Sequence, residues 1–459
     1  MKMTPMAIAC GLIFGASGSA WAAGPSEVEV LKQQMAALQQ QMAGLQQKLD
    51  HMAAAPQAAA KPASDHSALS ATIGGADVTL YGHADLSLES ANNGKQSITQ
   101  ASSNLSYIGV KGGKNLGSTG LRAIFQIETL ANISGTPTET GGLASRNSFV
   151  GLQGSLGSLM IGKTDTPYKR ATGKMDPFSA SVGDYNAIMG NTGGDLRAEF
   201  DARLPHSIWF DSAKMGGFSV NALYSPGQKL NNLTGAGNYA YPQGEKVCAG
   251  ATPGASGSTP DGNLCDDGAF TNAYSLALNY GAGPLNATFA YEKHSAVDRT
   301  GDTGGIVSDE SAAKLGLSYH FAIGNRLSGI AEKLYRDGGV NPALNERARS
   351  GYYLSDVQEL SHGLDLMAAW AHAGKTPGGP DFGTADDKAD MYSLGLKHHY
   401  DKQTSVYLVG AMLKNGPGAH YALGAGGHGV PIASPRDNSG ATIPGTTEKS
   451  LSVGMQYNF

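Results

Sequence analysis

Beyond residue 72, the chain consists of segments of about ten residues in which apolar and polar side chains alternate. Near the carboxyl terminus, for example, Leu451, Val453 and Met455 alternate with Ser452 and Gln456. This period of two is typical of a β-strand with one apolar and one polar face. Alternation alone fits either a soluble sandwich or a membrane barrel whose apolar face meets lipid. A transmembrane helix is excluded, because no stretch after the first twenty or so residues approaches ~18 consecutive apolar residues.

The order of the connections separates the two folds. We predict sixteen strands, at residues 77–90, 102–113, 119–131, 144–154, 157–166, 204–212, 217–225, 270–281, 284–294, 311–322, 325–335, 350–360, 363–373, 389–400, 403–414 and 448–459. Short connections, such as 155–156, alternate with long ones, such as 169–203 and 226–269. Such sorting is typical of an up-and-down barrel, and an even number of strands permits closure. We therefore predict an all-β fold, a sixteen-stranded antiparallel up-and-down transmembrane β-barrel over residues 73–459.

Composition and motifs narrow the function. The 459 residues include 64 glycines and only 15% charged residues, with a net charge of −5. This excludes a nucleic-acid binder with a basic surface and a polybasic membrane anchor. We find no catalytic arrangement of acid, histidine and nucleophile, and therefore expect no enzyme, no cofactor and no metal. His398-His399 is interpreted as a pair at the barrel rim, and Gly424-x-Gly426-x-x-Gly429 as part of a glycine-rich loop.

The amino terminus is typical of a secretory signal peptide, predicted for residues 1–22. Lys2 precedes an apolar run from Met6 to Ala16, and Ala20-x-Ala22 matches a cleavage site. Cys10 lies inside this segment, which leaves a lipoprotein as a weaker alternative.

Residues 23–54 carry a different pattern, in which apolar residues repeat at heptad positions a and d. The predicted core consists of Val28, Leu31, Met35, Leu38, Met42, Leu45, Leu49 and Met52. Such a repeat predicts a left-handed coiled coil in the periplasm, and a seam of this length needs partner chains to be stable. The alternative is a single amphipathic helix on a protein surface. The Ala/Pro-rich residues 55–72 are predicted to be a linker.

Several segments of the barrel region resemble one known family. These segments are 78–82 (Val-Thr-Leu-Tyr-Gly), 106–112 (Ser-Tyr-Ile-Gly-Val-Lys-Gly), 120–128, 145–152 and the terminal Tyr457-Asn458-Phe459. In order and spacing they resemble the Gram-negative general porins, in particular the sixteen-stranded trimeric type of β-proteobacteria. The resemblance implies a homotrimer embedded in outer-membrane lipid and lipopolysaccharide. It further implies passive diffusion of small hydrophilic solutes and ions, and an assembly signal at Tyr457 and Phe459.

In this family, the third outer loop folds into the lumen and faces a row of basic residues on the wall. The resemblance assigns the loop to residues 169–203, with Asp176 and Asp184 as well as Asp195, Glu199 and Asp201. It assigns the wall to Arg122, Arg146, Lys163 and Arg203, and adds Glu128 to the constriction. Opposed charges about 10 Å apart interact by roughly 0.4–1.7 kcal/mol, enough to sort ions without trapping them. Each basic residue has the alternative interpretation of a solvated rim charge or a structural ion pair.

The two cysteines beyond the signal peptide, Cys248 and Cys265, fall in one long connection. In an oxidising compartment we predict that they form a disulfide bond that stiffens this loop. Zinc is the competitor, but no histidine or second cysteine pair lies at ligand spacing.

The predicted coiled coil departs from the simple porin pattern and leaves other functions open. One alternative is a stalked porin that prefers organic anions or oligosaccharides. Another is a structural tether, with the barrel as an anchor and the coiled coil reaching toward peptidoglycan. An enzyme built into a barrel ranks third.

Overall fold

The computed structural model describes residues 69–135, 142–190, 200–226, 270, 272–298, 307–336, 348–375, 386–425, 428–430, 432, 435 and 443–459. Within these residues, helices are short, and none has the length and apolar character needed to cross a bilayer.

The described part is almost entirely β-structure. Its first nine strands are β1 (Leu69–Ile73), β2 (Ala76–Asn92), β3 (Ser97–Ser103), β4 (Tyr107–Asn115), β5 (Arg122–Leu130), β6 (Ser148–Gly154), β7 (Gly157–Asp165), β8 (Arg203–Ser212) and β9 (Phe218–Ser225). The others are β10 (Asn272–Ala282), β11 (Leu285–Asp298), β12 (Val307–His320), β13 (Asn325–Arg336), β14 (Ser350–Ser361), β15 (Leu364–Ala373), β16 (Ala389–His399), β17 (Thr404–Asn415) and β18 (Thr447–Asn458). Between β7 and β8 lie α2 (Pro167–Thr172) and the 3₁₀ turn η1 (Tyr185–Ala187).

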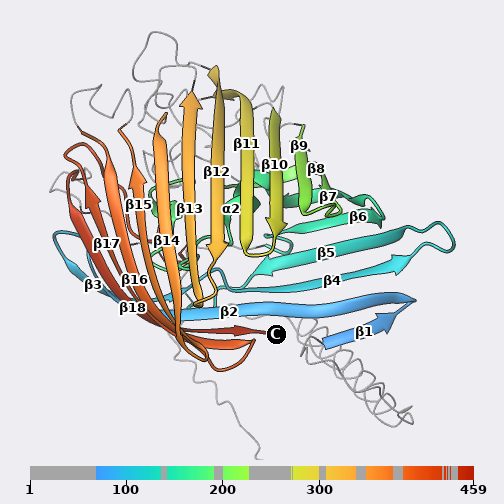
Figure 1. Ribbon diagram of the computed structural model, residues 1–459, viewed down its shortest axis with the longest axis horizontal. Helices are drawn as coiled ribbons and strands as arrows, with labels where there is room; N and C mark the ends of the chain where they lie inside the picture. Colours follow the sequence, from blue (N-terminus) through green and yellow to red (C-terminus); the bar gives the residue numbers. More distant parts are fainter. Residues whose placement is uncertain are drawn as a thin grey trace, which may run out of the picture. The chain divides into compact units, whose positions relative to one another are not determined.

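All strands belong to one antiparallel sheet that closes on itself (Figure 1). Each strand from β4 to β17 pairs with its successor, and β18 returns to pair with β2, from Lys449 opposite Asn92 to Asn458 opposite His83. β3 and β4 pair with successive parts of the same edge of β2, so together they count as one position in the barrel. β1 pairs with the first residues of β2 along its other edge. Sixteen positions therefore make up the barrel, which confirms the predicted fold class.

Two details of the amino-terminal strands differ from the prediction. A single strand was expected at residues 102–113, but Leu105 has a φ of 53°, and this left-handed conformation interrupts the ladder between β3 and β4. The Asn104 side chain fills the break by donating hydrogen bonds to Asp85, Ser87 and Tyr407. The sheet also begins at Leu69, inside the segment interpreted as a linker.

Alternation places apolar residues outside the barrel and mostly small or polar residues inside. On β18, Leu451 and Val453 are 54% and 55% exposed, whereas Ser450 and Ser452 between and beside them are buried. Tyrosine and phenylalanine pairs also occupy the outer face, including Tyr224 with Tyr274, whose ring centroids lie 5.0 Å apart. An apolar exterior with aromatic residues is the surface that a bilayer requires.

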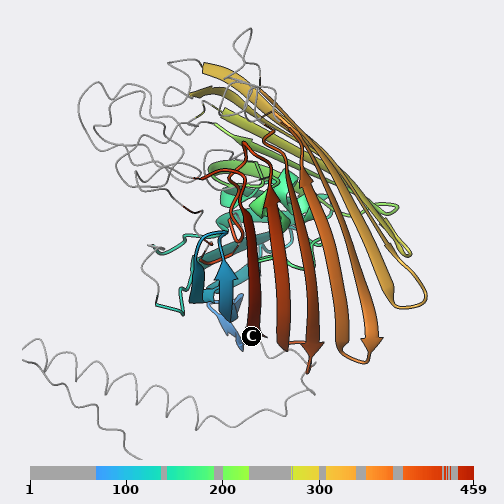
Figure 2. The same cartoon turned by 90° about the vertical axis from the view of Figure 1, so that its left-hand side faces the viewer.

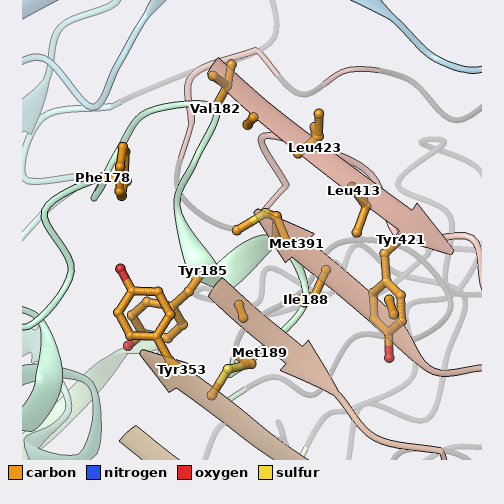
Figure 3. Close-up of a cluster of buried hydrophobic side chains, with 14 of the residues drawn as sticks. Phe178, Val182, Tyr185, Ile188, Met189, Tyr353, Met391, Leu413, Tyr421 and Leu423 are labelled. Atoms are coloured by element: carbon orange, nitrogen blue, oxygen red, sulfur yellow. The ribbon is translucent and has the colours of Figure 1, made fainter. Parts of the chain in front are cut away.

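Three clusters of buried apolar side chains lie in the described part of the barrel, and the largest of them lies against β13–β17. The described residues of the connection between β7 and β8, 166–190 and 200–202, run inward, and we call them the inward loop (Figure 2). Its buried residues Phe178, Val182 and Ile188 belong to an apolar cluster that includes side chains from β13–β17. Figure 3 shows this cluster, to which the last long connection adds Tyr421 and Leu423. We call this cluster the apolar pad.

Candidate functional site

The inward loop begins with the short helix α2, which the local sequence caps at its start. The Thr166 side chain accepts a hydrogen bond from the Lys169 amide, and Pro167 takes the first helical position, where no amide donor is needed. Tyr168 is fully buried, and its hydroxyl donates to Glu332 of β13 at 2.8 Å. The Lys314 ammonium of β12 lies 3.9 Å from the centre of the same ring. These contacts fasten the start of the loop to the β12–β13 wall.

Two aspartates hold the middle of the inward loop. Asp176 accepts hydrogen bonds from the Phe178 amide at 2.9 Å and from the Tyr353 hydroxyl of β14 at 2.6 Å. Asp184 accepts from the amides of Ala180 and Asn186, at 2.8 and 2.9 Å. Their carboxylates thus pin the turns of the loop and its contact with the wall.

Both carboxylates are deeply buried, at 7% exposure for Asp176 and 2% for Asp184. Burial raises the pKa of each group, and the neighbouring Asp184 charge raises the pKa of Asp176 further. Asp201, at the end of the loop, is also buried, and it pairs with Lys314. Asp176 and Asp184 therefore lie within the packed loop, and their predicted role as charges of the constriction stays a prediction.

Across the lumen, Arg146 and Glu128 form an ion pair. The Arg146 Nε lies 2.6 Å from the Glu128 Oε1, and the Tyr81 hydroxyl donates to the other carboxylate oxygen at 3.0 Å. The guanidinium also lies over the Tyr107 ring, 4.7 Å from its centre. The aromatic rings and the carboxylate therefore hold Arg146 in one position at the wall.

A second ion-pair network surrounds Arg203, the first residue of β8. Its guanidinium donates to Asn147 at 2.6 Å and pairs with Asp165 at 3.1 Å. Asp165 also pairs with Lys169 at 3.1 Å. Lys163 is half-buried on β7, two residues before Asp165 and opposite Ser148 of β6. The structure thus brings Arg203 to the side of the wall that also carries Arg146.

Arg122 lies elsewhere. It is the first residue of β5, next to the short connection at residues 116–121, and pairs with the exposed Asp77 at 3.1 Å. Six residues of extended strand separate it from Glu128, a distance of about 20 Å at ~3.4 Å per residue. The structure therefore does not bring Arg122 next to Arg146, although the resemblance assigned both residues to the same basic wall.

Sequence reasoning did not single out Lys111 on β4. Its ammonium lies 4.7 Å from the centre of the Tyr81 ring, so it joins the basic wall near Glu128. The signal was available in the strand parity, because Lys111 shares the parity of Tyr107 and Gly109.

The last long connection, between β17 and β18, was interpreted only as a glycine-rich loop. Its described residues instead pack inward, with Tyr421 and Leu423 in the apolar pad. The His428 Nε2 lies 2.5 Å from the Glu89 carboxylate of β2, and its Nδ1 lies 3.1 Å from the carbonyl oxygen of Ala180. The glycine-rich sequence of this segment gave no sign of such packing.

The remaining candidates divide into those the structure describes and those it does not. Phe459 exchanges two backbone hydrogen bonds with Gly82, at 3.0 and 3.1 Å, so the last residue joins the closing seam, and its ring contacts that of Tyr457. The coiled-coil core, the Cys248 and Cys265 pair, and Asp195 and Glu199 lie outside the described residues. Among the residues that are described, no group of three or more histidine, cysteine, aspartate or glutamate side chains is placed to hold a metal ion.

Comparison with known proteins identifies the family. The profile of the Gram-negative porins matches residues 52–418. The chain belongs to the Gram-negative porin family. As a porin, it is a general outer-membrane channel in bacteria, and a passive one rather than an enzyme.

Curated relatives and solved structures agree with this family. The major outer membrane protein P.IA of Neisseria meningitidis serogroup C is 26% identical over 391 residues, covering 75% of this porin and 91% of the relative. Protein P.IB of Neisseria meningitidis serogroup A is 26% identical over 375 residues, covering 77% and 93%. An anion-selective porin from Comamonas acidovorans superposes with a TM-score of 0.59 at 20% identity, covering 84% of this chain and all of that one. Salmonella typhi OmpF in complex with daunomycin gives 0.56 at 14% identity, with 85% and 100% covered. At these identities, the two solved structures show a shared fold.

Proposed function

We propose that this porin is a homotrimeric channel through which small hydrophilic solutes and ions diffuse. They would pass between the inward loop and the wall that carries Arg146 and Lys111, along a path that we call the polar lane. The observation that supports this most is the attachment of the described part of the inward loop to one side of the barrel interior. The inward loop is fastened to β12–β14 by Tyr168 and Asp176, so that the opposite wall keeps its charged side chains. That wall carries Arg146 and Lys111.

The proposed constriction comprises the charged side chains around this lane. Arg146, Lys163 and Arg203 would supply positive charge, and Glu128 and Asp165 would offset part of it. A mixed row of this kind creates a field across the lane that orients dipolar solutes and biases the passage of ions. Because each ion pair combines one positive and one negative side chain, its net charge is small. We therefore expect only modest ion selectivity in the unmodified protein.

A trimer is supported by a solved structure of the same fold. Vibrio cholerae OmpT, which has been solved in a trimer form, superposes with a TM-score of 0.51 at 13% identity. The proposed coiled coil at residues 23–54 would add a second trimer contact in the periplasm. Crosslinking of the full-length chain and of a variant lacking residues 23–54 would separate the two contributions.

Planar-bilayer recording with the purified full-length protein tests the proposal. A trimeric porin should insert with ohmic conductance and close in three equal steps at high voltage. Absence of conductance would contradict the channel and favour the structural tether. A count of free thiols on the protein without the signal peptide, residues 1–22, tests the proposed Cys248–Cys265 disulfide, which predicts none.

A further inference from the structure

A polar cavity of about 370 Å³ lies beneath the start of the inward loop, on the inner face of β9–β13. Its volume falls at the lower end of the ~300–1,000 Å³ range that is usual for small-molecule sites. The lining side chains come from the inward loop (Arg170 and Lys174) and from the strands facing it. This cavity is distinct from the proposed constriction, and it shares no residue with it.

The charge of the cavity is positive. Arg170, Lys174 and Arg326 line it together with His320, and no lining residue is a carboxylate. Asp211, which lies outside the lining, neutralises Arg170 through two hydrogen bonds of 2.8 Å. The other two cations keep unused donors.

The two remaining cations, Arg326 and Lys174, differ in how firmly their side chains are held. The Arg326 guanidinium donates to the Lys174 carbonyl oxygen at 3.1 Å, which orients its fork. Within the described part of the chain, the Lys174 ammonium has no hydrogen-bond or ion-pair partner. A guanidinium held in position and a flexible ammonium together match two anionic groups of one solute.

Neutral polar side chains complete the lining, and a series of hydrogen bonds fixes their orientation. The Thr288 hydroxyl donates to Asn279 at 2.8 Å, Asn279 donates to Asn221 at 2.8 Å, and Asn221 donates to Asp211 at 2.7 Å. This series of hydrogen bonds sets the orientation of the Asn279 and Asn221 amides before any solute binds. Asn286 and Ser318 line the same cavity and can bond solute hydroxyls.

We propose that this cavity is a solute subsite for small hydroxylated dicarboxylates, located between the inward loop and the short-turn end of the barrel. Lys174 and Arg326 would bind the two carboxylates, and the amide and hydroxyl side chains would bind the hydroxyl groups. The proposal deepens the proposed function, because it rests on the barrel being an open channel and names the class of solute that pauses in it. Binding must be weak, since a channel site has to release what it binds.

The test is block of single-channel current by tartrate, which carries two carboxylates and two hydroxyls. The full-length protein is recorded at low salt, because salt screens exposed charges. Succinate, which lacks the hydroxyls, glycerol, which lacks the carboxylates, and inorganic phosphate are compared at equal concentration. The variants are Lys174→Gln, Arg326→Gln and Asn286→Ala, with Lys402→Gln in the β16–β17 turn as a matched control at the same end of the barrel.

We expect transient block by tartrate, weaker block by succinate and phosphate, and none by glycerol. Lys174→Gln and Arg326→Gln should each raise the half-blocking tartrate concentration about two- to fivefold, the effect of losing one half-exposed ion pair. Asn286→Ala should weaken block by tartrate more than block by succinate, and Lys402→Gln should change neither.

Three outcomes would overturn the proposal while leaving the channel intact: normal conductance without tartrate block, equal block of wild type and both cation variants, or equal block by tartrate and succinate. Loss of all conductance in the wild-type protein would instead contradict the proposed function itself. Wild-type conductance in each variant shows that the variant has folded.

Discussion

Replacing Arg146 by glutamine should shift the ion selectivity of the channel toward cations. Arg146 and Glu128 form a pair whose side chains are 13% and 7% exposed, with the closest atoms 2.6 Å apart. The wild-type pair contributes little net charge to the lane. Arg146→Gln leaves the Glu128 carboxylate unbalanced at the wall, where it attracts cations and repels anions.

The size of the shift follows from the charge left behind. A unit charge about 10 Å from a permeating ion in water changes its energy by about 0.4 kcal/mol. The change has opposite signs for cations and anions, so their permeability ratio should change by about fourfold at low salt. At 0.1 M salt, where the Debye length is ~10 Å, screening reduces the effect to about twofold.

The assay is the reversal potential of bilayer currents across a salt gradient. Glu128→Gln should shift selectivity in the opposite direction, toward anions, because it leaves Arg146 unbalanced. The double variant Glu128→Gln/Arg146→Gln should return close to the wild-type ratio. Arg122→Gln serves as the comparison, since its partner Asp77 is 69% exposed and the pair lies about 20 Å away along the strand.

Two results would refute this reasoning. One is an Arg146→Gln channel with wild-type selectivity, which would remove the pair from the permeation lane. The other is a double variant that is as cation-selective as the Arg146 single variant, which would show that Glu128 is not the charge exposed by the change. Conductance itself reports whether each variant has folded.

Two further predictions concern the inward loop. Tyr353→Phe removes the hydroxyl that donates to buried Asp176 and should loosen the loop by about 1–3 kcal/mol, seen as faster hydrogen exchange over residues 176–189. Tyr352→Phe, on the outer face of β14, should leave exchange there unchanged. Burial raises the pKa of Asp176 and Asp184, so the folded loop binds more protons than the unfolded loop. Its stability should therefore fall as pH rises from the ordinary carboxyl range, near 4, through the raised pKa values. Exchange protection measured between pH 5 and 8 should decrease, and Asp176→Asn/Asp184→Asn should flatten the decrease; equal protection at both pH values in the unmodified protein would contradict this prediction.

Much of the barrel was predictable because the strand period is local information. Alternating side chains place one face in lipid whatever the rest of the chain does, so the sixteen positions and the sorting of connections followed from the sequence. The break at Leu105 did not, since nothing local marks a leucine that adopts a positive φ. Its stabilisation comes from Asn104 and Tyr407, which are three hundred residues apart in sequence.

The site was less predictable for the same reason. The residue types at Asp176 and Asp184 fitted an acidic loop, but their orientation is decided by amides within the loop and by Tyr353 on a distant strand. Arg146 and Glu128 were both assigned to the constriction through the family resemblance, but their contact depends on how the end of β5 lies beside the residues before β6. The inward packing of the β17–β18 connection depends on tertiary contacts such as His428 with Glu89.

The apolar pad has a consequence for how much current the channel carries. The perimeter of a barrel is set by its strand number, and sixteen strands enclose a wide bore. Here, side chains such as Ile188 and Tyr421 occupy the flank next to β13–β17. These side chains take space that water would otherwise fill, so the single-channel conductance should be smaller than the circumference of the cylinder alone would imply.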